Sequence, residues 1–202
     1  MYLRSVKRIG LTGGIGSGKS YIAKVLERMG YPVYYSDLRS RELTESHPDI
    51  KAGLINRFGT KIYHDGELNR KELAKNIFQS EDDRNYVNEL IHPIVRADFL
   101  HWCALQKREL VFNEAAILFE TGAYLQFDAT VLVIAPQEVR IQRIMARDQC
   151  TVEQAESRIQ SQWSDEQKIP LATCIITNDD KIPILNQIER VIAGLSTAKE
   201  VR

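Results

Sequence analysis

The segment from Gly13 to Ser20 constrains this chain more than any other feature. It reads Gly-Gly-Ile-Gly-Ser-Gly-Lys-Ser and satisfies the complete pattern G-x-x-x-x-G-K-S of a phosphate-binding loop. The apolar segment 6–12 before it reads as a short strand, and residues 19–29 after it place apolar side chains on one helical face. Strand, loop and helix therefore follow in the order that such a loop requires.

Each residue type in this segment has a physical role. Glycine lets the backbone wrap its N–H groups around phosphates at the positive end of a helix. Lys19 supplies a mobile positive charge for the β- and γ-phosphate oxygens, and Ser20 offers its hydroxyl to Mg²⁺. The alternative is a glycine-rich turn that only precedes a core helix, which would suit a looser pattern. We predict that the nucleotide is bound by Gly13, Gly14, Ile15, Gly16, Ser17, Gly18, Lys19, Ser20 and Tyr21.

Composition limits the partners of the chain. With 202 residues, of which 44% are hydrophobic and 27% charged, it can bury one substantial core and carry a small inserted subdomain. Lys plus Arg and Asp plus Glu number 27 each, so no global positive field favours nucleic acid. We expect a small-molecule substrate, no nucleic acid, no membrane partner, and a monomer or weak homo-oligomer.

The cysteines and the apolar runs indicate the compartment. Cys103, Cys150 and Cys174 are widely separated and lack the spacing of a zinc site, so we interpret them as buried or inert thiols. No apolar run approaches the length that spans a membrane. A cytoplasmic, reducing location is the simplest expectation.

The remaining apolar patterns predict an α/β fold. Short β-branched runs at 31–35, 109–112, 129–135 and 174–177 are typical of strands buried on both faces of a parallel sheet. Helical patterns cover most of 39–108 and recur at 137–149, 151–163 and 182–195, and Thr151-Val152-Glu153-Gln154 fits a capping box at the start of 151–163. We predict a single domain with a three-layer P-loop kinase core, in which helices flank a central parallel sheet. The core comprises about 1–38, 109–140 and 171–202, with a helical acceptor-binding insertion at 39–108 and a helical lid at 141–170.

Phosphoryl transfer needs a carboxylate near the acceptor and cations near the phosphates. Asp37 follows the strand 31–35, and the ligand crevice of an open α/β sheet lies beyond the carboxyl ends of its strands. Asp37 could therefore receive the acceptor proton, although a helix cap is the alternative and both roles could coexist. Arg140, Arg143 and Arg147 recur at helical spacing and could close over ATP as a lid, or could form a solvated helix face.

Two further positions have mainly structural interpretations. The pair His92-Pro93 stands in a helical pattern where proline is costly, so it indicates a helix boundary or a kink. Glu114 follows the strand 109–112 and could reach Mg²⁺, but a carboxylate at a strand end is more often solvated, and we expect that here.

Several motifs together resemble one enzyme family. They are G-L-T-G-G-I-G-S-G-K-S from Gly10, Tyr-Ser-Asp ending at Asp37, L-I-H-P-I-V from Leu90 and I-L-F-E from Ile117. The resemblance continues through 143–148, 158–162, Lys168 and 177–178. Over nearly its whole length, the chain is similar to the dephospho-coenzyme A kinases.

The resemblance implies a reaction and roles for particular residues. These kinases have a nucleoside-kinase-like fold and transfer the γ-phosphoryl group of ATP, with Mg²⁺, to the ribose 3′-hydroxyl of dephospho-coenzyme A. This is the last step of coenzyme A synthesis. By resemblance, Asp37 is the base, and the catalytic residues also include Lys19 and Arg147. The resemblance further implies acceptor contacts from Arg41 and His92, and ATP contacts from Arg143, Arg147 and, near the adenine, Asn178.

Three departures from the family pattern are visible. Tyr35 stands where the family often has another aspartate, which concentrates the role of base on Asp37. Tyr21 replaces a small hydroxyl residue, and Ala116 replaces a frequent proline.

Two other functions remain open at this point. A nucleoside or nucleotide monophosphate kinase would share the loop, the lid and the strand-end carboxylate, and acceptor profiling would separate it. A nucleotide-dependent switch would hydrolyse slowly and change partners with the γ-phosphate, but the chain has no guanine-reading N-K-x-D segment.

Overall fold

The computed structural model describes residues 6–64 and 66–197 and divides the chain into two compact units. The core unit comprises Met1–Tyr35 and Gln106–Arg202, and the helical unit comprises Ser36–Leu105. Parts of the expected core (1–5 and 198–202) and Asp65 of the expected insertion lie outside the described residues. The sequence places Asp37 in the core segment 1–38, whereas the contacts in the structure group it with the helical unit.

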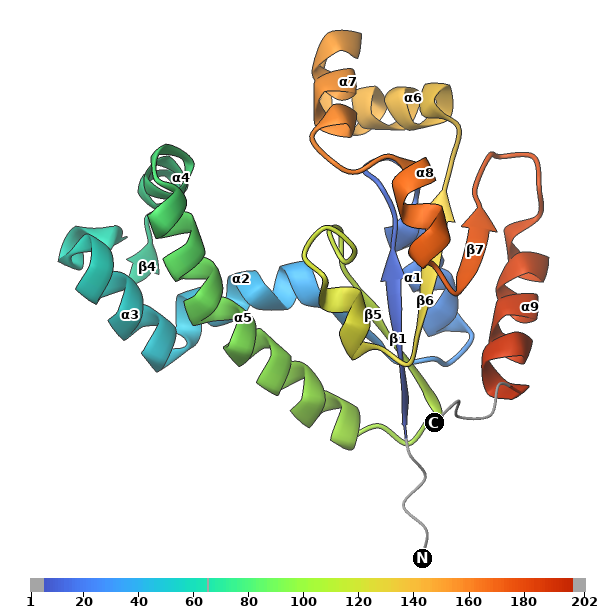
Figure 1. The fold of residues 1–202 in the computed structure, drawn as a ribbon, viewed down its shortest axis with the longest axis horizontal. Helices are drawn as coiled ribbons and strands as arrows, with labels where there is room; N and C mark the ends of the chain where they lie inside the picture. The colour runs from blue at the N-terminus through green and yellow to red at the C-terminus, as the bar shows by residue number, and fades with distance from the viewer. Residues whose placement is uncertain (1–5, 65, 198–202) are drawn as a thin grey trace, which may run out of the picture. The chain divides into compact units, whose positions relative to one another are not determined.

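A five-stranded parallel sheet forms the centre of the core unit (Figure 1). Its order is β2-β5-β1-β6-β7, which confirms the predicted α/β class with a central parallel sheet. In the register of the sheet, Leu11 pairs with Glu114 on one side and with Val131 on the other. The strands are β1 (Lys7–Thr12), β2 (Val33–Tyr35), β5 (Leu110–Glu114), β6 (Ala129–Ile134) and β7 (Cys174–Thr177).

Two long helices bury their apolar faces against this sheet. Helix α1 (Lys19–Arg28) contacts β1, β2 and β5 through a buried face that includes Ile22 and Leu26. Helix α9 (Ile184–Thr197) packs along β7 with Ile188 and Ile192 buried (Figure 1). Continuous apolar strands require such cover, because a parallel sheet has no solvated face.

Three helices follow the carboxyl end of β6. They are α6 (Gln137–Asp148), α7 (Val152–Gln160) and α8 (Asp165–Lys168). Thr151 and Ser164 begin α7 and α8 with reciprocal capping boxes, and the first of these was predicted from the sequence. Helix α8 was not predicted, since four residues are too few to show a helical period. Single helical turns at Ala123–Gln126 and Ile169–Leu171 complete this unit.

The helical unit has a hydrophobic core of its own. Helices α2 (Ser36–Ser46), α3 (Pro48–Phe58), α4 (Arg70–Gln79) and α5 (Glu81–Ala104) confirm the predicted helical character. The short antiparallel hairpin of β3 (Tyr63–His64) and β4 (Glu67–Leu68), which follows a turn at Thr60–Ile62, was not predicted, because two-residue strands give no alternation. The buried cluster is Leu43, Ile50, Leu54, Ile62, Leu73, Val87 and Ile91.

Helix α5 does not end at His92-Pro93, so of the two alternatives predicted there, a boundary or a kink, the structure excludes the boundary. The helix begins after Ser80, whose side chain accepts a hydrogen bond from the Asp83 N–H, and it continues through Pro93 to Ala104. Proline removes one backbone donor from a helix interior. Buried side chains on both sides of it, Ile91 before and Phe99 after, hold the two halves in place.

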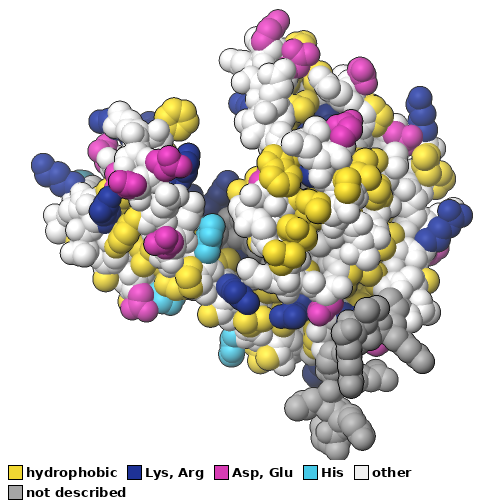
Figure 2. All heavy atoms as spheres, in the orientation of Figure 1, with side chains coloured by type: hydrophobic (Ala, Val, Ile, Leu, Met, Phe, Trp, Pro, Cys, Tyr) yellow, Lys and Arg dark blue, Asp and Glu magenta, His cyan; other side chains and the backbone are white. Residues whose placement is uncertain are grey.

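Charges of both signs are interspersed on the face shown in Figure 2. The three cysteines form no disulfide with one another in the described part of the chain. None of the described helices is long and apolar enough to cross a bilayer.

Candidate active site

The loop between β1 and α1 has the backbone shape that its glycines predict. Gly16 and Gly18 have φ angles of 80° and 90°, in the left-handed region that favours glycine. At Gly18 a Cβ would also collide with the side-chain amide of Asn178. No side chain of the described residues caps the start of α1, so the positive end of this helix is available to an anion.

Lys19, Ser20 and Glu114 form a polar cluster at the start of α1. The Ser20 hydroxyl donates to Glu114 Oε1 over 2.9 Å, and Lys19 Nζ lies 3.4 Å from the same oxygen. Glu114 is the last residue of β5, and its side chain is only 7% exposed. The prediction that Glu114 is merely solvated is therefore wrong: β5 extends two residues beyond the expected end and carries Glu114 to the phosphate loop.

This cluster fits a magnesium ion. Mg²⁺ prefers hydroxyl, carboxylate and phosphate oxygens, and the Ser20 hydroxyl and Glu114 carboxylate supply the first two in contact with each other. The Ser17 hydroxyl of the loop is buried and has no hydrogen-bond partner among the described residues. No group of three or more His, Cys, Asp or Glu with metal-site geometry occurs in 6–64 or 66–197, so the protein offers few ligands and the phosphates would supply the others.

Arg143 joins α6 to the phosphate loop and to the segment after β7. Its guanidinium donates to the carbonyl oxygens of Gly16 and Ser17, each over 3.3 Å. It also donates to the Asn178 carbonyl over 3.1 Å and to Asp180 Oδ1 over 2.7 Å.

Arg147 faces a different environment from Arg143. Its side chain is 61% exposed and forms two hydrogen bonds with the neighbouring Asp148 carboxylate, at 2.7 and 2.9 Å. These bonds, helped by Arg158, hold the pKa of Asp148 below its ordinary value, and the same bonds raise the pKa of Arg147. Arg147 is thus exposed to solvent, while Arg140 on the same helix is buried.

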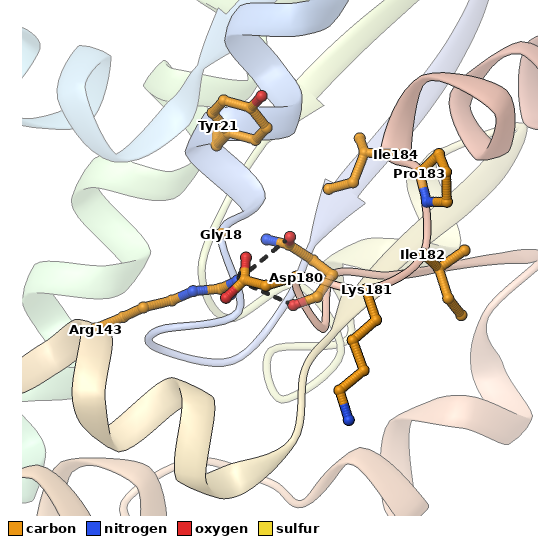
Figure 3. Close-up of a pocket in the computed structure, with 9 residues that line it drawn as sticks. Gly18, Tyr21, Arg143, Asp180, Lys181, Ile182, Pro183 and Ile184 are labelled. Atoms are coloured by element: carbon orange, nitrogen blue, oxygen red, sulfur yellow. Dashed lines mark hydrogen bonds and ion pairs between the residues drawn. The ribbon is translucent and has the colours of Figure 1, made fainter.

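A cavity of about 510 Å³ opens beside Gly18 (Figure 3). In Figure 3, Arg143 extends from α6 toward Asp180, to which its guanidinium donates a hydrogen bond. The loop that carries Asp180 and forms one wall of the cavity is held by the Asp179 carboxylate, which accepts hydrogen bonds from the backbone N–H groups of Lys181 and Ile182. The cavity is lined by Gly18, Tyr21, Arg143, Asn178, Asp180, Lys181, Ile182, Pro183 and Ile184.

The predicted acceptor residues lie in the helical unit. Asp37 and Arg41 are exposed and stand one turn apart on α2, so they share a face of that helix. The Asp37 side chain is exposed, so its carboxylate is accessible to a ligand. A bidentate pair of Arg39 with Asp98, at 2.9 Å for both bonds, ties α2 to α5. His92 is exposed on α5.

Three residues of the loop's surroundings were not predicted as site residues. Gln162 accepts the Ile15 N–H, Asp180 holds Arg143, and Glu114 was assigned to solvent. The extension of β5 to Glu114 follows from its pairing with Leu11 and Tyr35 in the sheet, which the sequence alone does not show. Gln162 and Asp180 carry no signal, since neither type is specific to nucleotide sites.

Comparison with known proteins decides the family. A family model described as dephospho-CoA kinase matches residues 7–183. A dephospho-CoA kinase of Bacteroides fragilis is 40% identical over 189 residues, which cover 93% of this chain and 92% of the relative. The chain belongs to the dephospho-CoA kinase family. A second dephospho-CoA kinase, from Porphyromonas gingivalis, is 37% identical and is matched over 95% of both chains.

Solved structures agree with the family fold. A Thermus thermophilus protein superposes with a TM-score of 0.84 at 30% identity, over 96% of this chain and 99% of the other. A dephospho-CoA kinase from Campylobacter jejuni has a TM-score of 0.66 at 22% identity, over 94% and 95% of the two chains, and supports the fold alone. The resemblance drawn from the motifs is confirmed, and the dephospho-CoA kinase family membership makes the protein a P-loop kinase rather than a nucleotide switch.

Proposed function

We propose that the protein transfers the γ-phosphoryl group of ATP to the ribose 3′-hydroxyl of dephospho-coenzyme A, which gives coenzyme A and ADP. The contact of Lys19 and Ser20 with one buried carboxylate, Glu114, carries the donor half of this proposal. The family match supports the acceptor half. As the final step of coenzyme A synthesis, the reaction uses soluble substrates, so we propose a cytoplasmic protein that acts as a monomer or weak homo-oligomer.

ATP occupies two adjoining parts of the core unit in this proposal. The triphosphate lies in the loop 13–20, whose glycines let backbone N–H groups approach it. The adenosine enters the 510 Å³ cavity beside Gly18, where Asn178 and the apolar segment Ile182 to Ile184 line the walls. Tyr21 lines the same cavity from α1 and offers a ring face rather than a second small hydroxyl.

Ser20 and Glu114 would hold Mg²⁺ in the reacting complex. Bound there, the ion would neutralise the charge that builds up on the β- and γ-phosphate oxygens. Lys19, now paired with Glu114, turns to the same oxygens when ATP is bound. The carboxylate thus keeps the lysine extended within the site before the nucleotide arrives.

Asp37 acts as the base. The acceptor 3′-oxygen forms its bond to the γ-phosphorus while the bond from that phosphorus to the bridging oxygen of ADP breaks, and the hydroxyl proton passes to the Asp37 carboxylate. Asp37 is exposed, and it follows Tyr35, the partner of Glu114 in the sheet, by two residues. Two residues of chain span at most about 7 Å, so the Asp37 backbone lies within about that distance of Tyr35 at the carboxyl end of β2.

The remaining predicted residues have supporting roles. Arg143, held near the loop by Gly16 and Asp180, and Arg147, which is exposed and paired with its neighbour Asp148, supply positive charge to the transferring phosphoryl group. Arg41 and His92 contact the acceptor from the helical unit. Both are exposed there.

The direct test is an acceptor profile. Purified protein is incubated with MgATP and, separately, dephospho-coenzyme A, nucleosides and nucleoside monophosphates, and products are identified by mass. We expect ADP and coenzyme A from the first acceptor and little product from the others. Faster phosphorylation of a nucleoside monophosphate would assign the chain to the rival kinase class.

A further inference from the structure

The backbone of Ile15 at the tip of the phosphate loop is held on both sides by side chains from outside the loop. Gln162 Oε1 accepts the Ile15 N–H over 2.7 Å. Arg140 Nε donates to the Ile15 carbonyl oxygen over 2.9 Å. Both partners are far away in sequence: Arg140 lies on α6, and Gln162 follows α7. The orientations of the two peptide units that flank Ile15, Gly14–Ile15 and Ile15–Gly16, therefore depend on α6 and on the segment that follows α7.

Arg140 is fixed more tightly than its single hydrogen bond to Ile15 implies. Its side chain is only 7% exposed and lies against Gly14, where a Cβ would collide with the guanidinium. On the other side, a Cβ at Gly16 would lie 2.7 Å from the Arg140 carbonyl oxygen. The arginine thus fills the space that two glycines of the loop leave open.

A row of alternating buried charges stands behind Arg140. Its Nη1 lies 3.6 Å from Asp165 Oδ1 on α8, and Asp165 interacts in turn with the charge of Lys168. Lys168 is fully buried with its Nζ 2.8 Å from Glu120. Burial raises the pKa of Asp165, while Arg140 and Lys168 oppose that rise. This row of charges helps to fix the orientation of the Arg140 guanidinium, which donates to the Ile15 carbonyl oxygen.

We propose that Arg140 and Gln162 are positioning residues that fix the two peptide units on either side of Ile15, and through them the phosphate loop, in the orientation that binds ATP. A phosphate loop binds through backbone N–H groups whose directions must be set in advance, because each peptide unit that turns away loses a donor to the anion. Gln162 holds the Gly14–Ile15 unit and Arg140 holds the Ile15–Gly16 unit, so rotation of either unit would change the backbone direction at Gly14 or Gly16. The inference relies on the proposed function only for its kinetic measurements.

The first test replaces the acceptor at Gln162 and keeps the side-chain volume. Gln162→Met removes the oxygen that receives the Ile15 N–H. We expect KM for ATP to rise about 5- to 10-fold, the effect of one lost hydrogen bond, with KM for dephospho-coenzyme A unchanged within about 2-fold. Arg140→Lys replaces the planar guanidinium with an ammonium group that cannot contact both Ile15 and Asp165 in the same geometry. This variant should also raise KM for ATP.

Gln154→Met is the matched control. Gln154 is an exposed glutamine on α7, and its side-chain oxygen accepts the backbone N–H of Thr151. The same chemical change there should leave both KM values within about 2-fold of wild type. If Gln162→Met and Gln154→Met have equal KM values for ATP, or if Gln162→Met lowers only kcat, the positioning role is wrong.

A second measurement does not depend on turnover. Hydrogen exchange of the Ile15 amide, followed by NMR, should accelerate by about an order of magnitude in Gln162→Met and stay slow in Gln162→Glu, which retains an acceptor oxygen. Affinity for ADP, measured by calorimetry, should fall in Gln162→Met alongside the faster exchange. Unchanged exchange and ADP affinity would overturn the proposal even in an active enzyme, whereas a wild-type protein that forms no coenzyme A would overturn only the function.

Discussion

Replacing Lys168 should strongly destabilise the core unit, because it leaves a buried carboxylate without its partner. Its side chain is fully buried, and Glu120, its partner at 2.8 Å, is only 13% exposed. The two atoms form an ion pair but are not aligned as a hydrogen bond. Lys168→Met keeps the length of the stem and removes the charge, so the Glu120 carboxylate remains buried without its partner.

The magnitude follows from the separation of the charges. Two unit charges 2.8 Å apart attract by about 6 kcal/mol at an effective dielectric constant of about 20, and breaking a buried pair typically costs about 3–5 kcal/mol. A domain is stable by about 5–15 kcal/mol. For a chain of 202 residues, this loss corresponds to a decrease in melting temperature of about 6–20 °C.

Urea and thermal unfolding followed by circular dichroism would measure this loss. The double variant Lys168→Met/Glu120→Gln removes both charges and should recover most of the stability lost in Lys168→Met, because no buried charge is left unpaired. Lys24→Met, an exposed position on α1, is the control and should change stability by less than about 0.5 kcal/mol. The single variant Glu120→Gln completes the comparison. If the losses of unfolding free energy in Lys168→Met and Glu120→Gln simply add in the double variant, the pairing argument is refuted.

Three further outcomes test the site. Asp37→Asn should leave ATP binding nearly intact and lower kcat about 100-fold or more, and near-normal turnover would exclude Asp37 as the base. Glu114→Gln should raise the Mg²⁺ concentration needed for half-maximal rate, which a titration of rate against Mg²⁺ measures; an unchanged requirement would remove Glu114 from the metal site. Asp179 accepts two backbone N–H bonds that hold its pKa below the ordinary 3.8, so these bonds stabilise the cavity wall above that pH and are lost as pH falls through the lowered pKa. An NMR titration in which Asp179 protonates at or above 3.8 would contradict this assignment.

The sequence was sufficient for the elements that repeat over many residues. Helix α1, the strand β7 and the capping box at Thr151 were predicted within a residue or two, because buried periodicity and caps are local. The loop 13–20 was predicted from its residue types alone. Local patterns did not reveal α8 or the β3–β4 hairpin, which are too short to show a period.

The site was predicted where chemistry is carried by a motif and missed where it is carried by tertiary contacts. Lys19 and Ser20 belong to the motif. Gln162 reaches Ile15 only because the chain folds back over 147 positions, and no pattern near Gln162 indicates that contact. The burial of Glu114 depended on two extra residues of β5, and strand ends are set by pairing with neighbours rather than by local preference.

The contact between Arg140 and the loop has a consequence for which sequences can replace this one. The phosphate-loop pattern leaves positions 14 and 16 unrestricted, yet Arg140 occupies the space where a methyl group at Gly14 would stand and lies against Gly16. An alanine at position 14 therefore requires a smaller side chain at position 140. Positions 14 and 140, which are 126 residues apart along the chain, should therefore change together or not at all. A redesign that substituted only the unrestricted positions of the motif would disable the loop.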